Sequence, residues 1–107
     1  MPATNVRVEQ GAKQFQGAFT EMWAVTGTMD FASVADGNST SDTITVPGVA
    51  LGDMVIGVSF GVDAALGVVT AYVSAANTVR VVVSNLETAA LDLASTTVKV
   101  LVGRPAW

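Results

Sequence analysis

The sequence contains neither cysteine nor histidine among its 107 residues. The absence of cysteine excludes a disulfide framework, a thiolate metal site and a cysteine nucleophile. The absence of histidine removes the commonest general base, the commonest metal ligand and every Ser-His arrangement. The sequence therefore favours a structural protein that assembles with other proteins over an enzyme. We expect no enzymatic activity, no cofactor and no metal site.

Charge is also scarce, because only 13% of the residues are charged, about half the usual quarter. Five basic residues are scattered along the chain, and the net charge is −4. Nucleic-acid binding therefore has no electrostatic footprint. Half of the residues are hydrophobic, so we expect part of the surface to be buried against partner proteins. A monomer coated in Thr, Ser and Asn is the alternative.

Long hydrophobic runs are missing as well. No window holds about 18 uninterrupted apolar residues, so we expect no membrane span. Residues 1–7 lack the charged-then-apolar pattern of a signal peptide, which indicates a protein made in a cytoplasm without an obvious export signal. The length fits a single domain.

Paired carboxylates are the remaining enzymatic option, because glycoside hydrolysis needs only two. Nearly all of the acidic residues fall in turns or at strand ends, where Asp is favoured for side-chain to backbone hydrogen bonds. Residues 36–42 carry oxygen ligands, but the glycine is second where a calcium loop needs it sixth, and Pro47 replaces the bidentate Glu. We expect ordinary polar turns at these places.

From residue 27 onward, apolar and polar residues alternate in short runs separated by turn residues, which is typical of β-strands. The short link at residues 75–77 predicts an antiparallel hairpin. Six or seven strands with little helix predict an all-β fold, an antiparallel β-sandwich or small β-barrel. The predicted inward sets are Ile44 and Val46; Met54, Ile56, Val58 and Phe60; Val69, Ala71 and Val73; Val79, Val81 and Val83; and Val98, Val100 and Val102. A further strand is expected near residues 28–35, and residues 4–9 are expected to form either a short strand or an extended arm.

The first 26 residues follow a different pattern. Phe15, Phe19, Met22 and Trp23 recur at helical spacing. We therefore predict an N-terminal arm over residues 1–26, with one or two helical turns after residue 11, and a β-domain over residues 27–107. The large side chains of the arm are expected to be buried either in the domain's own core or against a neighbouring subunit.

Three further apolar residues lie where a half-solvated sheet normally carries polar ones. Val82 and Leu101 are on the face opposite the inward valines, and Trp107 follows Pro105 near the end of the sequence. Either the arm covers this surface or another chain does. The predicted interface residues are Phe15, Phe19, Met22, Trp23, Val82, Leu101 and Trp107.

Several short segments resemble small virion proteins of tailed bacteriophages, namely the capsid decoration, or cement, proteins and related head or tail-fibre β-domains. The segments are residues 24–27, 30–35, 50–55, 67–69, 73–79, 91–95 and 98–100. The resemblance implies a capsid-stabilising subunit on the exterior of the virion, often a homotrimer, that binds the major capsid protein where capsomers meet. It implies no catalytic residues.

Two other functions remain open. A tail or fibre domain that binds a host-surface receptor has the same composition and strand pattern. An enzyme acting on cell-wall sugar would depend on Asp36, Asp42 or Asp53, and it is the weakest hypothesis.

Overall fold

The computed structural model describes residues 2–11, 17–64 and 67–107, and within these ranges the regular structure consists of strands. The seven strands are β1 (Thr4–Gln10), β2 (Phe19–Met29), β3 (Ser39–Thr45), β4 (Met54–Phe60), β5 (Val68–Ala75), β6 (Thr78–Ser84) and β7 (Thr96–Pro105). The described residues contain no helix that is long and apolar enough to cross a membrane.

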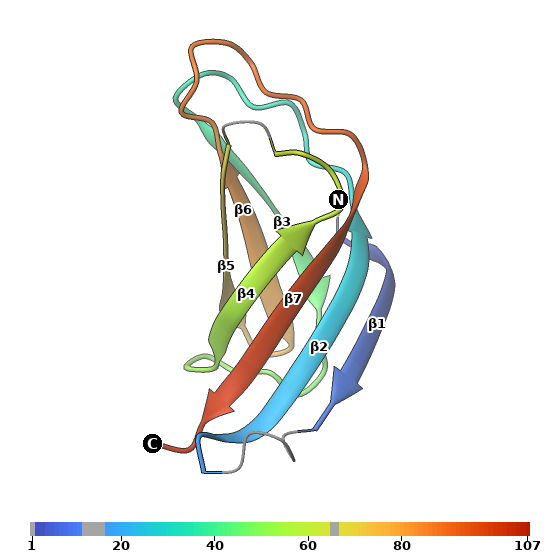
Figure 1. Cartoon of the computed structure of the whole chain (residues 1–107), viewed down its shortest axis with the longest axis vertical. Coiled ribbons are helices and arrows are strands. Elements are labelled where there is room, and N and C mark those ends of the chain that lie inside the picture. The colour runs from blue at the N-terminus through green and yellow to red at the C-terminus, as the bar shows by residue number, and fades with distance from the viewer. Residues whose placement is uncertain (1, 12–16, 65–66) are drawn as a thin grey trace.

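The strands form two antiparallel sheets that pack face to face (Figure 1). The four-stranded sheet has the order β1-β2-β7-β4, and the three-stranded sheet has the order β3-β6-β5. The two sheets are not joined into a closed barrel. The fold prediction is therefore confirmed in its sandwich form.

The core follows from strict alternation along the central strands. On β6, Val79, Val81 and Val83 are completely buried, while the residues between them are half-buried on the other face. The inward valines of β7, Val98, Val100 and Val102, join the same cluster from the opposite sheet. Burying one such side chain contributes roughly 1.5–3 kcal/mol, so this interdigitated layer holds the sheets together. The inward sets predicted for β5, β6 and β7 are confirmed.

The helical prediction for the N-terminal segment is wrong where the structure describes it. Residues from Phe19 onward form β2, which lies between β1 and β7 and is hydrogen-bonded to both. Trp23, Val25 and Met29 alternate into the core. A strand is favoured here over a helix because it pairs with β1 on one edge and with β7 on the other. The predicted boundary between residues 26 and 27 lies inside β2.

The predicted faces of β4 are also partly wrong, because the strand contains a β-bulge. Val55 is paired with Val102 and Gly57 with Leu101, so Ile56 is an extra residue without an opposite partner. A bulge reverses the alternation. Val58 and Phe60 pack on the core as predicted, but Val55 does so too, and Ile56 faces outward with Met54.

At the upper end in Figure 1, three loops meet, formed by residues 30–38, residues 61–64 and residues 85–95. The strand predicted at residues 28–35 ends at Met29, and Val34 only forms an isolated bridge to Leu91. The buried Asn85 side chain connects two of these loops, residues 30–38 and residues 85–95. Its amide nitrogen donates to the carbonyl oxygens of Val34 (2.9 Å) and Ala89 (2.8 Å), and its oxygen accepts from the N–H of Glu87 (2.9 Å).

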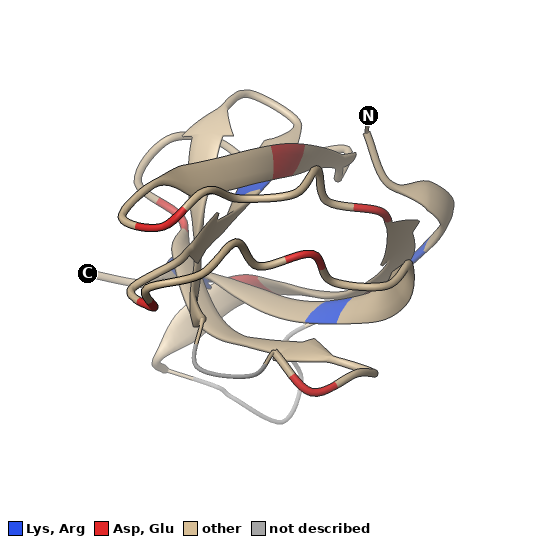
Figure 2. Ribbon diagram, turned by 90° about the horizontal axis from the view of Figure 1, so that it is seen from above, with Lys and Arg blue, Asp and Glu red and all other residues tan. Residues whose placement is uncertain are grey.

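The same three loops carry most of the acidic residues and no basic residue, and Figure 2 shows the red segments lying mainly in loops. We call this the acidic end, defined by Asp30, Asp36, Asp63, Glu87 and Asp92. Among the described residues, no group of three or more acidic side chains is arranged to hold a metal ion.

Replacing Asn85 with Ala is expected to lower the free energy of unfolding by about 2–4 kcal/mol, because a completely buried side chain loses three hydrogen bonds and each contributes roughly 0.5–1.5 kcal/mol. Chemical denaturation of the purified protein measures this. Asn38→Ala is the control, since Asn38 is exposed in the same loops and its replacement is expected to change stability by less than about 0.5 kcal/mol. Equal effects of the two variants would contradict the role assigned to Asn85.

Candidate functional site

Gly103 creates an unusual place on the outer face of the four-stranded sheet, the face turned away from the core. It lies on β7 between Met22 of β2 and Met54 of β4. A Cβ atom on Gly103 would lie 2.7 Å from a ring carbon of Phe19 and 3.1 Å from the Cδ1 atom of Ile56. Only glycine therefore lets Phe19 and Ile56 close over β7.

Trp107 extends this group of apolar side chains. Its ring centroid lies 6.0 Å from that of Phe19 at an interplanar angle of 54°, a tilted geometry that aromatic pairs favour. The N–H of Ala106 donates to the carbonyl oxygen of Ala18 (3.0 Å) and holds this segment beside the start of β2. Trp107 nevertheless keeps 79% of its surface exposed.

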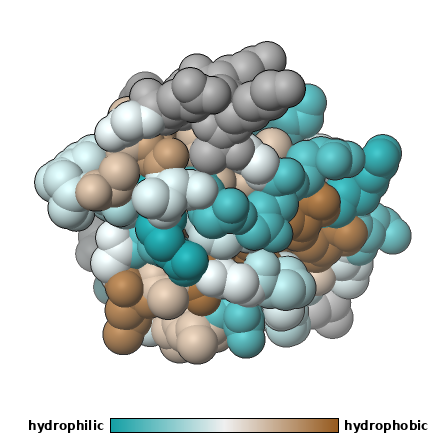
Figure 3. All heavy atoms as spheres, turned by 90° about the horizontal axis from the view of Figure 1, so that it is seen from below, coloured by the Kyte–Doolittle hydropathy of each residue, from teal (hydrophilic) through white to brown (hydrophobic). Residues whose placement is uncertain are grey.

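We call this group the apolar cluster. Met54 and Ile56 are 43% and 46% exposed, so large apolar side chains face solvent on one part of one face. Figure 3 shows the end of the molecule where the C-terminus lies, with apolar residues gathered in separate areas among polar ones. The cluster consists of the exposed Met54, Ile56 and Trp107, the half-buried Phe19 and Leu101, and Met22, which is only 3% exposed.

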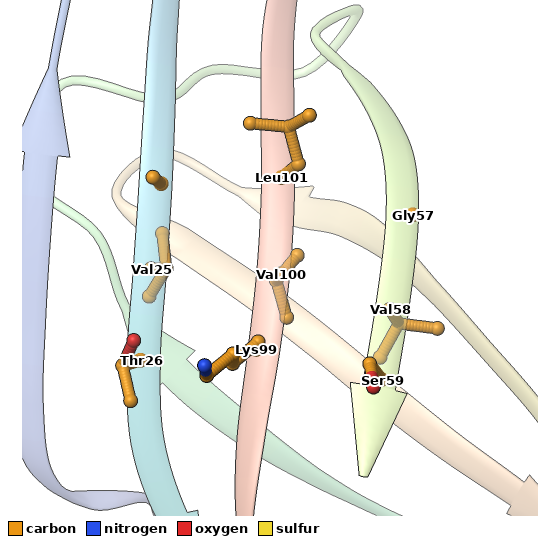
Figure 4. Close-up of a pocket in the computed structure, with 9 residues that line it drawn as sticks. Val25, Thr26, Gly57, Val58, Ser59, Lys99, Val100 and Leu101 are labelled. Atoms are coloured by element: carbon orange, nitrogen blue, oxygen red, sulfur yellow. The ribbon is translucent and has the colours of Figure 1, made fainter.

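Next to the cluster, the outer face is hollowed because small residues flank Leu101. Ala24 of β2 and Gly57 of β4 are the direct cross-strand neighbours of Leu101. The hollow has a volume of about 370 Å³ and extends along the strands to Ser59 and Lys99, as Figure 4 shows. A second hollow of about 270 Å³, between β1 and β2, shares Ala24 and Leu101 with the first. Together they give this face a grooved surface that is mostly apolar.

A salt bridge anchors the β3–β4 loop near the cluster. Arg104 of β7 donates from Nε to Oδ1 of Asp53 (3.0 Å) and from Nη2 to Oδ2 (2.9 Å). The same Nη2 donates to the carbonyl oxygen of Gly48 (2.9 Å), and the guanidinium lies 5.2 Å from the ring centroid of Trp23, within cation–π range. The bridge therefore ties the loop before β4 to the end of β7.

The environment of Asp53 shifts its pKa. Partial burial by itself would raise the pKa of Asp53, but the hydrogen bonds from Arg104 and from the N–H of Ala50 outweigh it, and the pKa lies below its ordinary value. The hydrogen bond with Asp53 correspondingly raises the pKa of Arg104. The pair is therefore charged at neutral pH.

Four of the predicted interface residues lie in the apolar cluster: Phe19, Met22, Leu101 and Trp107. Trp23 belongs to the core and is 1% exposed, because it lies on the inward face of β2. Phe15 lies outside the described residues.

Val82 is not in the cluster. It lies on the outer face of the three-stranded sheet, between Ser41 and Thr70. Met54 and Ile56 were missed, because the bulge that turns Ile56 outward has no signature in the alternation. Gly103 lies two residues after Leu101, on the same face of the strand. This glycine was the signal in the sequence that other side chains approach β7 closely there.

The three carboxylates considered for sugar hydrolysis are not brought together. Asp36 is in a loop at the acidic end, Asp42 is on β3, and Asp53 is bound to Arg104 at the other end of the sandwich. A glycosidase needs two carboxyl groups within about 10 Å of each other on either side of a substrate, whereas the carboxylate of Asp53 is engaged by Arg104 at the end of the sandwich opposite Asp36.

No protein-family model, no curated protein and no solved structure matches this chain.

The pH dependence of stability tests the Asp53–Arg104 bridge. Because the folded-state pKa of Asp53 is lowered from its ordinary 3.8, the bridge contributes stability above that value and loses it as the pH falls through the folded-state pKa. Arg104 is about one-third exposed, so solvent screening reduces the contribution to about 1–2 kcal/mol. Asp53→Asn should be less stable than the unmodified protein by this amount at pH 7, and the difference should shrink below about pH 4.

Denaturant titrations at several pH values measure this difference. Asp92→Asn, at an exposed position in the acidic end, is the matched control and should unfold like the unmodified protein. A penalty for Asp53→Asn that stays constant down to pH 2 would show that the charge on Asp53 is not what stabilises the loop.

Gly103→Ala tests the close approach of Phe19. The added methyl group overlaps the ring, so Phe19 and Ile56 must move off β7 and the Phe19–Trp107 contact is lost. We expect a cost of about 1–3 kcal/mol and a changed environment of the Trp107 indole in NMR spectra. Gly57→Ala is the control, because a Cβ atom there meets nothing within 4 Å; similar spectra for both variants would contradict the packing described.

Proposed function

We propose that the chain is a structural protein of a tailed-bacteriophage virion that binds the outside of the capsid and stabilises the joints between capsomers. The observation that supports this proposal is the apolar cluster, in which Met54, Ile56 and Trp107 are exposed together beside an apolar groove. Exposed apolar patches of this kind mark protein-interaction sites. The occupant we propose is the major capsid protein.

The energetics of such a contact suit a repeated lattice. A docked patch of about 400 Å² contributes roughly 10 kcal/mol at 25 cal/mol per Å². Association costs of about 4–15 kcal/mol offset much of this, so one copy binds modestly. Many copies on one shell add their contributions, and each joint becomes harder to open. Because the contact is apolar, its affinity should depend weakly on salt.

A second candidate, a tail or fibre domain that binds a host receptor, is favoured by one observation. The three loops of the acidic end meet at one end of the sandwich, and loops on a rigid scaffold commonly carry recognition. This function predicts that deletion abolishes adsorption to cells, whereas the decoration function predicts unchanged adsorption and capsids that release DNA at lower temperature.

Trp107→Ala tests capsid docking. Removing a large, exposed aromatic anchor from the centre of a contact typically costs 2 kcal/mol or more, so binding to capsids of the phage that encodes the chain should weaken about 30-fold. Co-sedimentation with capsids that lack the protein measures this. Leu86→Ala is the matched control, because Leu86 is similarly exposed (73%) but lies at the acidic end, and its affinity should stay within about twofold.

Cryo-electron microscopy of the particle gives an independent test. Density for this chain on the outer capsid lattice, with the face that carries Trp107 against the shell, supports the proposal. Equal loss of capsid binding in both variants, or density on the tail and not on the capsid, would overturn it.

A further inference from the structure

The four edge strands of the sandwich are protected unequally. The edge strand β1 carries the exposed Arg7 and Glu9, and the segment before it is tied to β3 by a hydrogen bond from the N–H of Ala3 to the carbonyl oxygen of Thr43 (2.8 Å). β3 carries Asp42. Charges of this kind discourage pairing with another chain. On this side, the edges of both sheets are therefore protected.

The other two edge strands, β4 and β5, carry no charged residue at all. They also hold four of the large hydrophobic residues with exposed side chains, Met54, Ile56, Val68 and Tyr72. An apolar, uncharged edge strand is a template for another strand, because its outward N–H and C=O groups lack partners. Within the described part of the chain, β4 pairs with β7 along one of its edges only.

The register identifies which backbone groups of β4 face outward. The N–H of Gly61 donates to the carbonyl oxygen of Thr97 (2.9 Å), and Ser59 and Gly57 follow at intervals of two on the same ladder. In an antiparallel pair the intervening residues point their N–H and C=O groups away from the partner. Val58 and Phe60 therefore present these groups to the free edge, in the half of β4 that follows the bulge.

We infer that β4 is a self-association edge, on which a second copy of this chain pairs its own β4 in antiparallel orientation to continue the four-stranded sheet across a two-fold axis. The pairing uses the backbone edge of β4, whereas the apolar cluster would dock through the outer face of the sheet; Met54 and Ile56 belong to both β4 and the cluster, and the inference does not rest on the capsid function. Backbone hydrogen bonds from Val58 and Phe60 of each copy would form the new ladder.

The distribution of charge favours this pairing over the alternatives. β4 runs toward the acidic end and β5 runs away from it (Figure 1). Antiparallel pairing of β4 with β4 places the two acidic ends at opposite ends of the dimer. Pairing of β4 with β5 of the next copy, as in a closed ring, would place the acidic ends side by side and cost like-charge repulsion.

Beside β4, the exposed residues continue into the apolar cluster. The two-fold arrangement leaves two copies of the cluster on one face of a continuous sheet, and it differs from the trimer that the resemblance implies.

Sedimentation velocity of the purified full chain tests the assembly. A species of twice the 10.9 kDa protomer mass is expected. A trimer, or a monomer at every soluble concentration, would overturn the inference.

Gly57→Lys then tests the edge itself. The added side chain meets nothing within 4 Å in one protomer, so the fold should persist, as circular dichroism and denaturation can verify. A charge in the paired segment of each copy should weaken dimerisation at least tenfold. Thr70→Lys, at an exposed position on β5, is the matched control and should dimerise normally. A dimer that survives Gly57→Lys, or one that only Thr70→Lys disrupts, would contradict the assignment.

Amide hydrogen exchange gives a readout specific to the ladder. The N–H groups of Val58 and Phe60 should be protected in the unmodified dimer and should exchange at least tenfold faster in Gly57→Lys. Fast exchange of both amides in the unmodified dimer would show that the copies associate through another surface.

Discussion

The structure depends on the contact between two rows of valine across the middle of the sandwich. Val98, Val100 and Val102 of β7 face Val79, Val81 and Val83 of β6, and all six belong to one buried cluster. Because side chains alternate along a strand, placing these valines inward forces Lys99, Leu101 and Gly103 onto the outer face. The apolar cluster and the groove are therefore consequences of core packing on β7, with small neighbours on β2 and β4 leaving space around Leu101.

The sequence predicted those parts of the fold where the apolar residues fit the period of a strand and did not also fit the period of a helix. The three valine runs of β5, β6 and β7 alternate strictly, and their faces were predicted correctly. Phe19, Met22 and Trp23 fit a helical stripe as well as a strand, and what decided between them was pairing with β1 and β7, which is not visible locally. The bulge at Ile56 was hidden for a similar reason, since an inserted residue appears only when a partner strand defines the register. Of the six residues of the apolar cluster, Phe19, Met22, Leu101 and Trp107 were predicted from their apolar character, but neither Met54 nor Ile56 was.

The two ends of the sandwich differ in chemistry. One end gathers five carboxylates in loops without a basic residue, and the other carries exposed apolar side chains around a charged pair that is already satisfied. The molecule is elongated, with extents of 45 × 26 × 22 Å, so these two regions are well separated. Under the proposed function, a chain docked by its apolar cluster would turn its acidic loops away from the contact, and the resulting negative outer surface would discourage nonspecific attachment of further copies.

The position of β7 in the four-stranded sheet has a consequence for how the chain acquires its structure. β3, β5 and β6 lie within residues 39–84, so their sheet can assemble from neighbouring segments, with the β5–β6 hairpin as a local start. In contrast, β2 and β4 have no direct contact ladder and are joined only through β7. Loop closure over such separations is slow. During synthesis on the ribosome, β2 and β4 therefore lack the strand that joins them until residues 96–105 emerge. In this interval their apolar side chains are not yet covered, and the nascent chain is most exposed to aggregation.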